Sequence, residues 1–285
     1  MSPEDLASRA AVAALLRSRG IRPSKRLGQN FLVDRSVLNR IVSEVRVCAP
    51  REVVEIGAGL GTVTRELAAL AERVLAVEID ARLADGLERS LGDLANVEVR
   101  RGDFLKLDLR AIGEGPVFVV GSIPYRITAP ILNHLVDSRG AISGVVLLTQ
   151  SEVARKIAAS PGVEGSSLGV RVRAYGDVTR LREVPRSSFY PIPEVDSTLW
   201  RLVFLEAPRF SAGEEVFFAL VRTLYGKRRK MIRGALRDLL PAEGVAEVIR
   251  AAAIDPTVRG ETLSFEELDR LAIAVSRTDR AAQDS

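Results

Sequence analysis

Short apolar runs alternate with segments of helical periodicity through the first half of the chain. The runs are rich in Val, Ile and Leu, and they predict strands at 52–56, 73–78, 97–101, 117–121 and 144–148. Apolar residues at helical spacing between them predict helices at 62–71, 81–91 and 128–138. Strands that alternate with helices in this way are typical of a parallel, doubly wound sheet, so the predicted fold class is α/β.

The segments before this alternation are helical and basic. Residues 4–19 predict an amphipathic or alanine-rich helix, and the basic stretch 20–30 predicts a loop. A second helix running to about residue 47 would be capped by Asp34 or Ser36, because both side chains can accept a backbone N–H.

The segments after the alternation predict an antiparallel edge and then a helical domain. Two later strands are expected at 171–174 and 199–204, and the connection between them is too rich in proline for another crossover helix. From residue 207 strand signals stop, and helices are expected at 213–225, 228–239, 242–253 and 264–275. We therefore expect two domains, 1–206 and 207–285.

The composition removes several classes of chemistry. The chain has 285 residues with one Cys, Cys48, and one His, His134. These residues cannot form an intrachain disulfide or the usual zinc sites, so we expect no metal. The sequence has no apolar run of membrane-spanning length and no basic signal region at its start, and it is poor in cysteine. We therefore expect a cytoplasmic protein with no membrane partner.

The charge is concentrated in two regions. The net charge is +4, and residues 1–50 hold nine Lys or Arg against four Asp or Glu, whereas 51–206 are close to neutral. A second basic region contains Lys227, Arg228, Arg229, Lys230, Arg233 and Arg237. Such patches suit an anionic partner such as nucleic acid, with a solvated helix face as the alternative.

The clearest ligand signature is VVEIGAGLG at 53–61, an apolar strand that runs into a glycine-rich turn. Glycines in such a turn allow a tight bend and close approach of a ligand. A dinucleotide site is the alternative, but its fingerprint is Gly-x-Gly-x-x-Gly, and Thr62 stands where a glycine would be needed. Glu55 also suits a ligand with a positive centre better than a pyrophosphate.

Acidic residues follow the next two predicted strands. Glu78 is placed to accept both ribose hydroxyls of an adenosine, whereas Asp80 suits the cap of the following helix. Asp103 could accept the adenine amino group, and Phe104 could lie against the ring. Each alone could be a helix cap or a core residue, but their succession at carboxyl ends of neighbouring strands predicts an adenosine pocket.

The fourth predicted strand ends in the turn SIPY at 122–125. Ser122 offers a hydroxyl acceptor, Pro124 makes the turn rigid, and Tyr125 offers an aromatic face. This set suits an exocyclic amine on a planar base, although a plain proline turn is the alternative. Methylation of an amine needs orientation more than acid–base chemistry, which is consistent with the lack of a catalytic His or Cys.

Four motifs identify a family resemblance. They are KRLGQNFL at 25–32, EIGAGLG at 55–61, FYPIPEVDS at 189–197 and YGKRRK at 225–230. Together they resemble the small-subunit ribosomal RNA adenine dimethyltransferases, the KsgA/RsmA family, over about residues 20–275, and more distantly the Erm resistance methyltransferases. The second motif is shared by many methyltransferases, whereas the other three are specific. The resemblance implies a Rossmann-like class I methyltransferase domain followed by a small helical RNA-binding domain.

The resemblance also implies roles for individual residues. S-adenosylmethionine would be bound by Asn30, Leu32, Gly57, Gly59, Glu78, Asp103 and Ser122. Phe189 would stack on the target adenine, opposite or beside Tyr125, with Pro124 in the same catalytic set; a core aromatic is the alternative for Phe189. RNA phosphates would be contacted by Lys25, Arg26, Lys227, Arg228, Arg229 and Lys230. Ser122 stands where the family usually has Asn, and we expect activity to be retained because its hydroxyl still accepts one hydrogen bond.

The implied reaction is methyl transfer to N6 of two adjacent adenosines near the 3′ end of 16S rRNA in the immature 30S subunit, catalysed by a monomer. Two alternatives stay open. One is an Erm-type 23S rRNA adenine-N6 methyltransferase, and the other is a 30S assembly factor whose catalysis is weakened by Ser122.

Overall fold

The structure is a computed structural model that describes residues 6–159 and 165–283. The chain divides into two compact units, one formed by Met1–Ala154 with Val178–Phe204 and the other by Arg155–Asp177 with Leu205–Ser285. Residues 155–177, expected in the first domain, group with the second unit because helix α8 (Ser167–Tyr175) contacts helix α9 (Glu214–Gly226).

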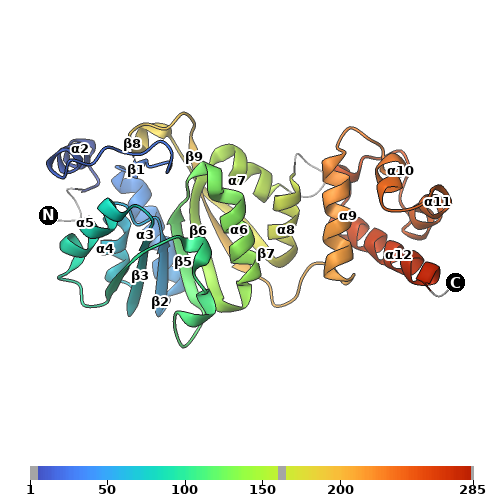
Figure 1. Ribbon diagram of the computed structural model, residues 1–285, viewed down its shortest axis with the longest axis horizontal. Coiled ribbons are helices and arrows are strands. Elements are labelled where there is room, and N and C mark those ends of the chain that lie inside the picture. Colours follow the sequence, from blue (N-terminus) through green and yellow to red (C-terminus); the bar gives the residue numbers. More distant parts are fainter. Residues whose placement is uncertain (1–5, 160–164, 284–285) are drawn as a thin grey trace. The chain divides into compact units, whose positions relative to one another are not determined.

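The first unit is built on a seven-stranded sheet with the order β4-β3-β2-β5-β6-β9-β7 (Figure 1). The strands are β2 (Glu52–Ile56), β3 (Arg73–Glu78), β4 (Val97–Arg101), β5 (Val117–Ser122), β6 (Ile142–Gln150), β7 (Gly176–Val184) and β9 (Ser197–Phe204). The five predicted strands of the alternation are confirmed, and they pair in parallel. Strand β9 pairs antiparallel with β6, as the proline-rich connection predicts.

The strand order creates the place for a ligand. The chain runs outward from β2 through β3 to β4 and then returns to the other side of β2 with β5. Open α/β sheets bind ligands at this point of reversal, outside the carboxyl ends of the strands. The glycine-rich turn after β2 and the SIPY turn after β5 meet there, because their strands are neighbours.

Each helix up to residue 158 buries apolar side chains. These helices are α2 (Arg9–Ser18), α3 (Arg35–Cys48), α4 (Thr62–Ala68), α5 (Ala81–Leu91), α6 (Thr128–Asp137) and α7 (Ser151–Ala158). Asp34 caps α3 and Asp80 caps α5, each accepting backbone N–H groups of the first turn. Leu38 and Ile41 of α3 share one buried cluster with the sheet residues Val53 and Phe118.

A two-stranded antiparallel ribbon joins two motifs that are far apart in the sequence. Strand β1 (Phe31–Leu32) pairs with β8 (Phe189–Tyr190), so that Phe31 faces Tyr190 and Leu32 faces Phe189. The Ser188 hydroxyl donates to the carboxylate of Asp34 at 2.7 Å and reinforces the same junction. The basic N-terminal motif and the late proline-rich motif therefore form one structural feature.

Two predictions of secondary structure are wrong. Residues 171–174 lie in helix α8 rather than in a strand, and β7 begins only at Gly176. The alternating buried residues Val170, Val172 and Ala174 resemble a strand in a short window, but the Ser166 hydroxyl accepts the Gly169 N–H and starts a helix.

The second wrong prediction is a helix over 228–239. Helix α9 ends at Gly226, and the Lys230 N–H closes a turn onto the Lys227 carbonyl. Only Ile232–Ala235 (α10) and the 3-10 turn Leu236–Asp238 follow. The later helices α11 (Ala242–Ala251) and α12 (Phe265–Gln283) are confirmed. The described residues contain no helix that is both long and apolar enough to cross a bilayer.

Candidate active site

The glycine-rich turn after β2 has a backbone that only glycine adopts readily. Gly57, Gly59 and Gly61 have φ angles of 71°, 60° and 85°, all in the left-handed region. This conformation explains the Gly-x-Gly-x-Gly spacing, because each alternate residue has a positive φ. Helix α4 begins at Thr62, directly after the turn, as predicted.

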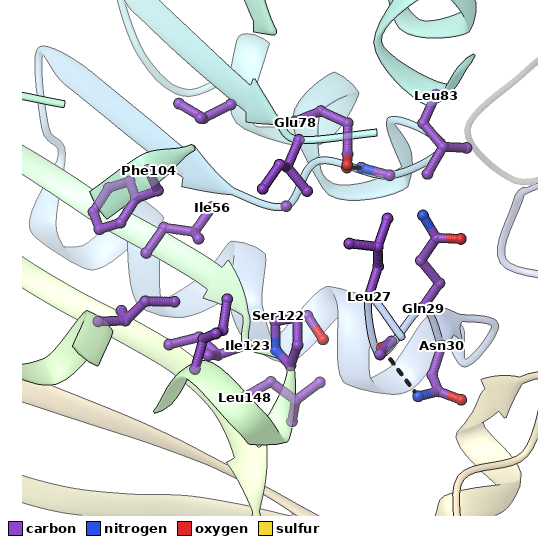
Figure 2. Close-up of a pocket in the computed structure, with 18 of the residues that line it drawn as sticks. Leu27, Gln29, Asn30, Ile56, Glu78, Leu83, Phe104, Ser122, Ile123 and Leu148 are labelled. Carbon is purple, nitrogen blue, oxygen red and sulfur yellow. Dashed lines mark hydrogen bonds between the residues drawn. The ribbon is translucent and has the colours of Figure 1, made fainter. Parts of the chain in front are cut away.

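A cleft lies at the carboxyl ends of the strands, with about 960 Å³ of free space that is partly open to solvent. Figure 2 shows Leu27, Gln29 and Asn30 on one side and Phe104 on the other, with Glu78 and Ser122 between them. The predicted site residues that line this cleft are Asn30, Gly57, Gly59, Glu78, Asp103, Ser122, Pro124 and Phe189. Leu32 lines a smaller neighbouring pocket that shares Asn30, Gly57, Gly59 and Ser122.

Glu78 is held with its carboxylate at the cleft. Its Oε2 accepts the Gly59 N–H at 2.9 Å, and its Oε1 accepts the Asp80 N–H at 2.8 Å. Each oxygen has a second lone pair, so both can still accept a hydroxyl donor. Burial raises the pKa of Glu78, although these two backbone hydrogen bonds oppose that shift.

Asp103 and Phe104 line the far end of the cleft. One carboxylate oxygen of Asp103 accepts the Leu105 N–H and caps a 3-10 turn, while the other is not used by this cap. The ring of His134 meets Phe104 edge-on, with centroids 5.3 Å apart, and its Nε2 lies 3.0 Å from the Leu107 carbonyl. The single histidine therefore supports the adenine end of the predicted pocket from behind.

Glu55 is a buried carboxylate beside the glycine-rich turn. It is 3% exposed, and its Oε2 has no hydrogen-bond partner among the described residues. Burial raises the pKa of Glu55 to about 8; the nearby Thr64 hydroxyl opposes this shift, and the charge of Glu78 adds to it. Glu55 lines the smaller pocket, where an ammonium group would supply the missing partner.

The SIPY turn closes the cleft next to the glycine-rich turn. Ser122 is exposed to the cleft, and its carbonyl oxygen lies 3.7 Å from where a side chain on Gly57 would begin. The Pro124 carbonyl accepts the Ile127 N–H at 3.1 Å, so Pro124 contributes its rigid ring to the cleft wall. The backbone of Tyr125 begins a 3-10 turn, and its side chain lies outside the described part of the structure.

Phe189 borders the cleft from the hydrophobic core. It is 3% exposed and belongs to the same buried cluster as Leu32. Its neighbour Tyr190 is more exposed, and the guanidinium of Arg9 lies 5.9 Å from the centre of the Tyr190 ring. The ribbon of β1 and β8 pairs Phe189 with Leu32, and Asn30, which also lines the cleft, directly precedes β1.

The predicted RNA-binding residues fall into two groups. Lys25 and Arg26 are exposed next to the cleft residue Leu27. In the second unit, Lys227 pairs with Asp238, and Arg228 pairs with Glu261 at 3.5 Å and donates to the Gly165 carbonyl.

Arg229 and Lys230 differ from the two basic residues that precede them. Both are exposed, and neither forms a salt bridge with the described residues, although the charge of Lys230 contributes to the lowered pKa of Asp238. The turn therefore contains two cations with protein partners, Lys227 and Arg228, and two that face solvent.

Sequence reasoning missed the apolar walls of the cleft. Ile79 is 53% exposed although it is aliphatic, and Ile127 is 37% exposed. Both line the cleft, together with the buried Leu83, Ile123 and Ile131. The only signal in the sequence was an aliphatic residue directly after Glu78, at the carboxyl end of the strand, and the sequence does not show that its side chain is exposed to the cleft.

These residues fit S-adenosylmethionine, the cofactor that the family resemblance implies. Glu78 offers two lone pairs for the ribose hydroxyls, and Ile79 and Phe104 offer apolar surfaces for the adenine. The orphaned oxygen of Glu55 suits the ammonium group of the methionine part. The described residues contain no group of three or more His, Cys, Asp or Glu that could hold a metal ion.

Comparison with known proteins agrees with this site. A family model described as ribosomal RNA adenine dimethylase matches residues 21–275. Proteins named ribosomal RNA small subunit methyltransferase A from Moorella thermoacetica and Geobacter metallireducens are 40% and 39% identical to this chain. The alignments cover 96% and 91% of this chain and 99% and 98% of those relatives.

Solved structures show the same fold. The 23S rRNA methyltransferase ErmE aligns with a TM-score of 0.70 and 30% identity, over 87% of this chain and all of that one. A dimethyladenosine transferase from Plasmodium falciparum aligns with a TM-score of 0.76 and 23% identity, over 87% of this chain and 98% of that one. The first unit has the class I methyltransferase fold, and the cofactor is S-adenosylmethionine. The chain belongs to the ribosomal RNA adenine dimethylase family.

Proposed function

We propose that this protein methylates N6 of two adjacent adenosines near the 3′ end of 16S rRNA, in the immature 30S subunit, and produces N6,N6-dimethyladenosine. The observation that carries the proposal is the position of Ser122. This residue lines both the main cleft and the smaller pocket at the glycine-rich turn. A hydroxyl that can accept a hydrogen bond from the target amine therefore lies directly beside the proposed cofactor-binding residues.

The site residues orient the reactants. S-adenosylmethionine supplies an electrophilic methyl group when it is bound. Asn30, Leu32, Gly57, Gly59, Glu78 and Asp103 would hold the cofactor, and Ser122 would accept a hydrogen bond from the adenine amine. Phe189, Pro124 and Tyr125 would hold the base plane, so that the nitrogen lone pair faces the methyl group. Orientation of this kind can supply most of the catalysis that amine methylation needs.

The basic residues would bind RNA without reading its sequence. Lys25 and Arg26 are exposed beside the cleft, and the turn 227–230 adds four cations in the second unit. Contacts to phosphates position a nucleic acid, whereas the choice of adenosine would come from the folded RNA, which presents an unpaired base. We expect the protein to act in the cytoplasm as a monomer, with the assembling subunit as its partner.

The test is a transfer assay with two substrates. The protein is incubated with tritiated S-adenosylmethionine and either unmethylated 30S subunits or naked 23S rRNA. Label in the 30S subunits supports the proposal, and label only in 23S rRNA would contradict it. Binding to 30S subunits without transfer would favour an assembly factor that Ser122 has weakened.

One structural comparison favours the 23S rRNA alternative. The structural likeness to ErmE covers all of that chain at 30% identity. The curated relatives at 39–40% identity are instead named for the small subunit, and they match nearly the whole chain. The small-subunit substrate is therefore the proposal, and the two-substrate assay distinguishes it from the alternative.

A further inference from the structure

Residues 27–30 form a strap along one wall of the cofactor cleft. Leu27, Gly28, Gln29 and Asn30 all line the cleft, and Figure 2 shows three of them on the same side. The Asn30 side chain donates to the Gly28 carbonyl at 3.2 Å, which makes the strap a compact turn. Each side of this turn contacts a different part of the site.

One side of the strap touches the SIPY turn. Gly28 has a φ of 64°, and a side-chain carbon built on it would lie 2.8 Å from the Cβ of Pro124. Only glycine therefore fits at position 28, because a side chain there would collide with Pro124. This contact joins the strap to the part of the cleft where the methyl group is transferred.

The other side of the strap is held by Gln29. Its Nε2 donates to Oδ2 of Asp80 at 2.9 Å, and its Oε1 accepts the Ser24 N–H at 2.7 Å. Both ends of the amide are used, one within the N-terminal segment and one on the cap of helix α5. Asp80 is 7% exposed and Gln29 is half-buried, so this hydrogen bond is partly shielded from water.

Asp80 connects Gln29 to the ribose end of the site. Its own N–H donates to Glu78 at 2.8 Å, and its Oδ1 accepts the Arg82 N–H at the start of α5. Hydrogen bonds from Arg82 and Gln29 lower the pKa of Asp80 to about 2, so the carboxylate is an acceptor at neutral pH. The strap is therefore anchored to the residue pair that would hold the ribose.

We propose that Gln29 is a positioning residue that latches the strap to Asp80 and so controls how fast the cofactor product leaves the cleft. The inference rests on the proposed cofactor site and adds a residue that the motif reading did not assign. Two methyl transfers to one adenine require an exchange of cofactor between them. The strap lines one wall of the cleft and contacts Asp80 and Pro124, so its opening would widen the cleft for that exchange.

The test measures dissociation of S-adenosylhomocysteine from the full chain by stopped-flow displacement. Gln29→Ala should raise the dissociation rate about 5- to 30-fold, because it removes a partly shielded hydrogen bond to a carboxylate. Gln29→Glu should also raise it, because two carboxylates then face each other. The exchanged pair Gln29→Glu with Asp80→Asn restores a donor and an acceptor between these two positions. It loses one hydrogen bond from the Arg82 guanidinium, so its rate should recover from that of Gln29→Glu toward wild type without fully reaching it.

Controls separate the latch from local unfolding. Arg22→Gln changes an exposed residue of the same segment and should leave the dissociation rate unchanged. Hydrogen exchange of the amides at 24–30 should accelerate in Gln29→Ala. Faster exchange with an unchanged dissociation rate would overturn the latch, and so would an exchanged pair whose rate does not recover from that of Gln29→Glu. If S-adenosylhomocysteine did not bind to the wild-type protein, the cofactor assignment would be overturned as well.

Discussion

The proposed chemistry depends on a single hydroxyl group, that of Ser122. It ends β5, and it borders both pockets of the site. A hydroxyl has one donor and two acceptor lone pairs, whereas the asparagine that is usual in the family offers a carboxamide. In the proposed mechanism this residue would set how firmly the target amine is held.

Replacement of Ser122 tests that role. Ser122→Ala should lower the turnover number about tenfold, because one hydrogen bond to the amine is lost. Its affinity for S-adenosylhomocysteine should change little, and Ser122→Asn should keep or raise turnover. The measurement is methyl transfer to 30S subunits alongside calorimetry of cofactor binding. A fully active Ser122→Ala enzyme would show that the hydroxyl has no role in catalysis.

Glu55 gives a pH-dependent prediction. Its pKa in the folded protein, about 8, lies above the ordinary carboxyl value of 4.5, so the folded protein binds a proton that the unfolded chain releases. The free energy of unfolding should therefore fall as pH rises from 4.5 to 8, by up to about 1.4 kcal/mol per pH unit from this group. Glu55→Gln should remove this part of the slope.

Urea unfolding of the cofactor-free protein at several pH values measures the Glu55 effect. The difference between Glu55→Gln and wild type should grow in favour of the variant up to about pH 8 and then level off. Parallel pH curves for the two proteins would contradict a buried, neutral Glu55.

Residues whose role follows from their place at the end of a strand or the start of a helix could be predicted from the sequence. Residues whose role depends on a contact with a distant part of the chain could not. Asp80 was expected as a helix cap and Glu78 as a ribose acceptor, and both lie where the strand ends place them. Gln29 had no such signal, because its partner Asp80 is 51 positions away in the sequence. Ile79 was missed because periodicity cannot tell that an apolar side chain faces a cleft.

At the scale of elements, strands buried on both faces were predicted best. Strands β2 and β3 have their expected bounds, because continuous apolar runs flanked by helices leave few alternatives. The edge strand β4 also has its expected bounds, although it is only half-buried and carries three charged residues. One error falls at 171–174, where a window of a few residues fits both the period of a strand and that of a helix. The other falls at 228–239, where a run of basic residues was interpreted as the exposed face of a helix. The turn 227–230 is basic but not helical, since Gly226 ends α9.

The turn 227–230 predicts unequal contributions to RNA binding. Arg229→Gln with Lys230→Gln should weaken binding to 30S subunits and lower the slope of log affinity against log salt by about one per lost contact. The reason is that both side chains face solvent, whereas Lys227 and Arg228 have protein partners. Filter binding at several salt concentrations measures both quantities.

A matched pair controls for net charge in that experiment. Arg250→Gln with Arg277→Gln removes the same charge from exposed positions of the second unit. An equal loss of affinity in this control would mean that total charge, rather than the turn, binds the RNA.

At the scale of the whole molecule, composition and architecture agree on a transfer enzyme that orients its reactants. The chain has one His, placed behind Phe104, and one Cys, which is exposed on α3. Neither lines the cleft, whose lining instead offers carboxylates, a hydroxyl and aromatic rings. The division into units was only partly visible in the sequence, because 155–177 joins the helical unit through contacts that no local pattern encodes.

The central claim is double methylation of two neighbouring adenines on the small subunit. The most direct measurement is nucleoside mass spectrometry of 16S rRNA from unmethylated 30S subunits, incubated with the protein and S-adenosylmethionine and then mapped by fragment mass. We expect N6,N6-dimethyladenosine at two adjacent positions near the 3′ end, with the monomethyl form appearing first. Unmodified 16S rRNA, or modification confined to a 23S rRNA control, would contradict it.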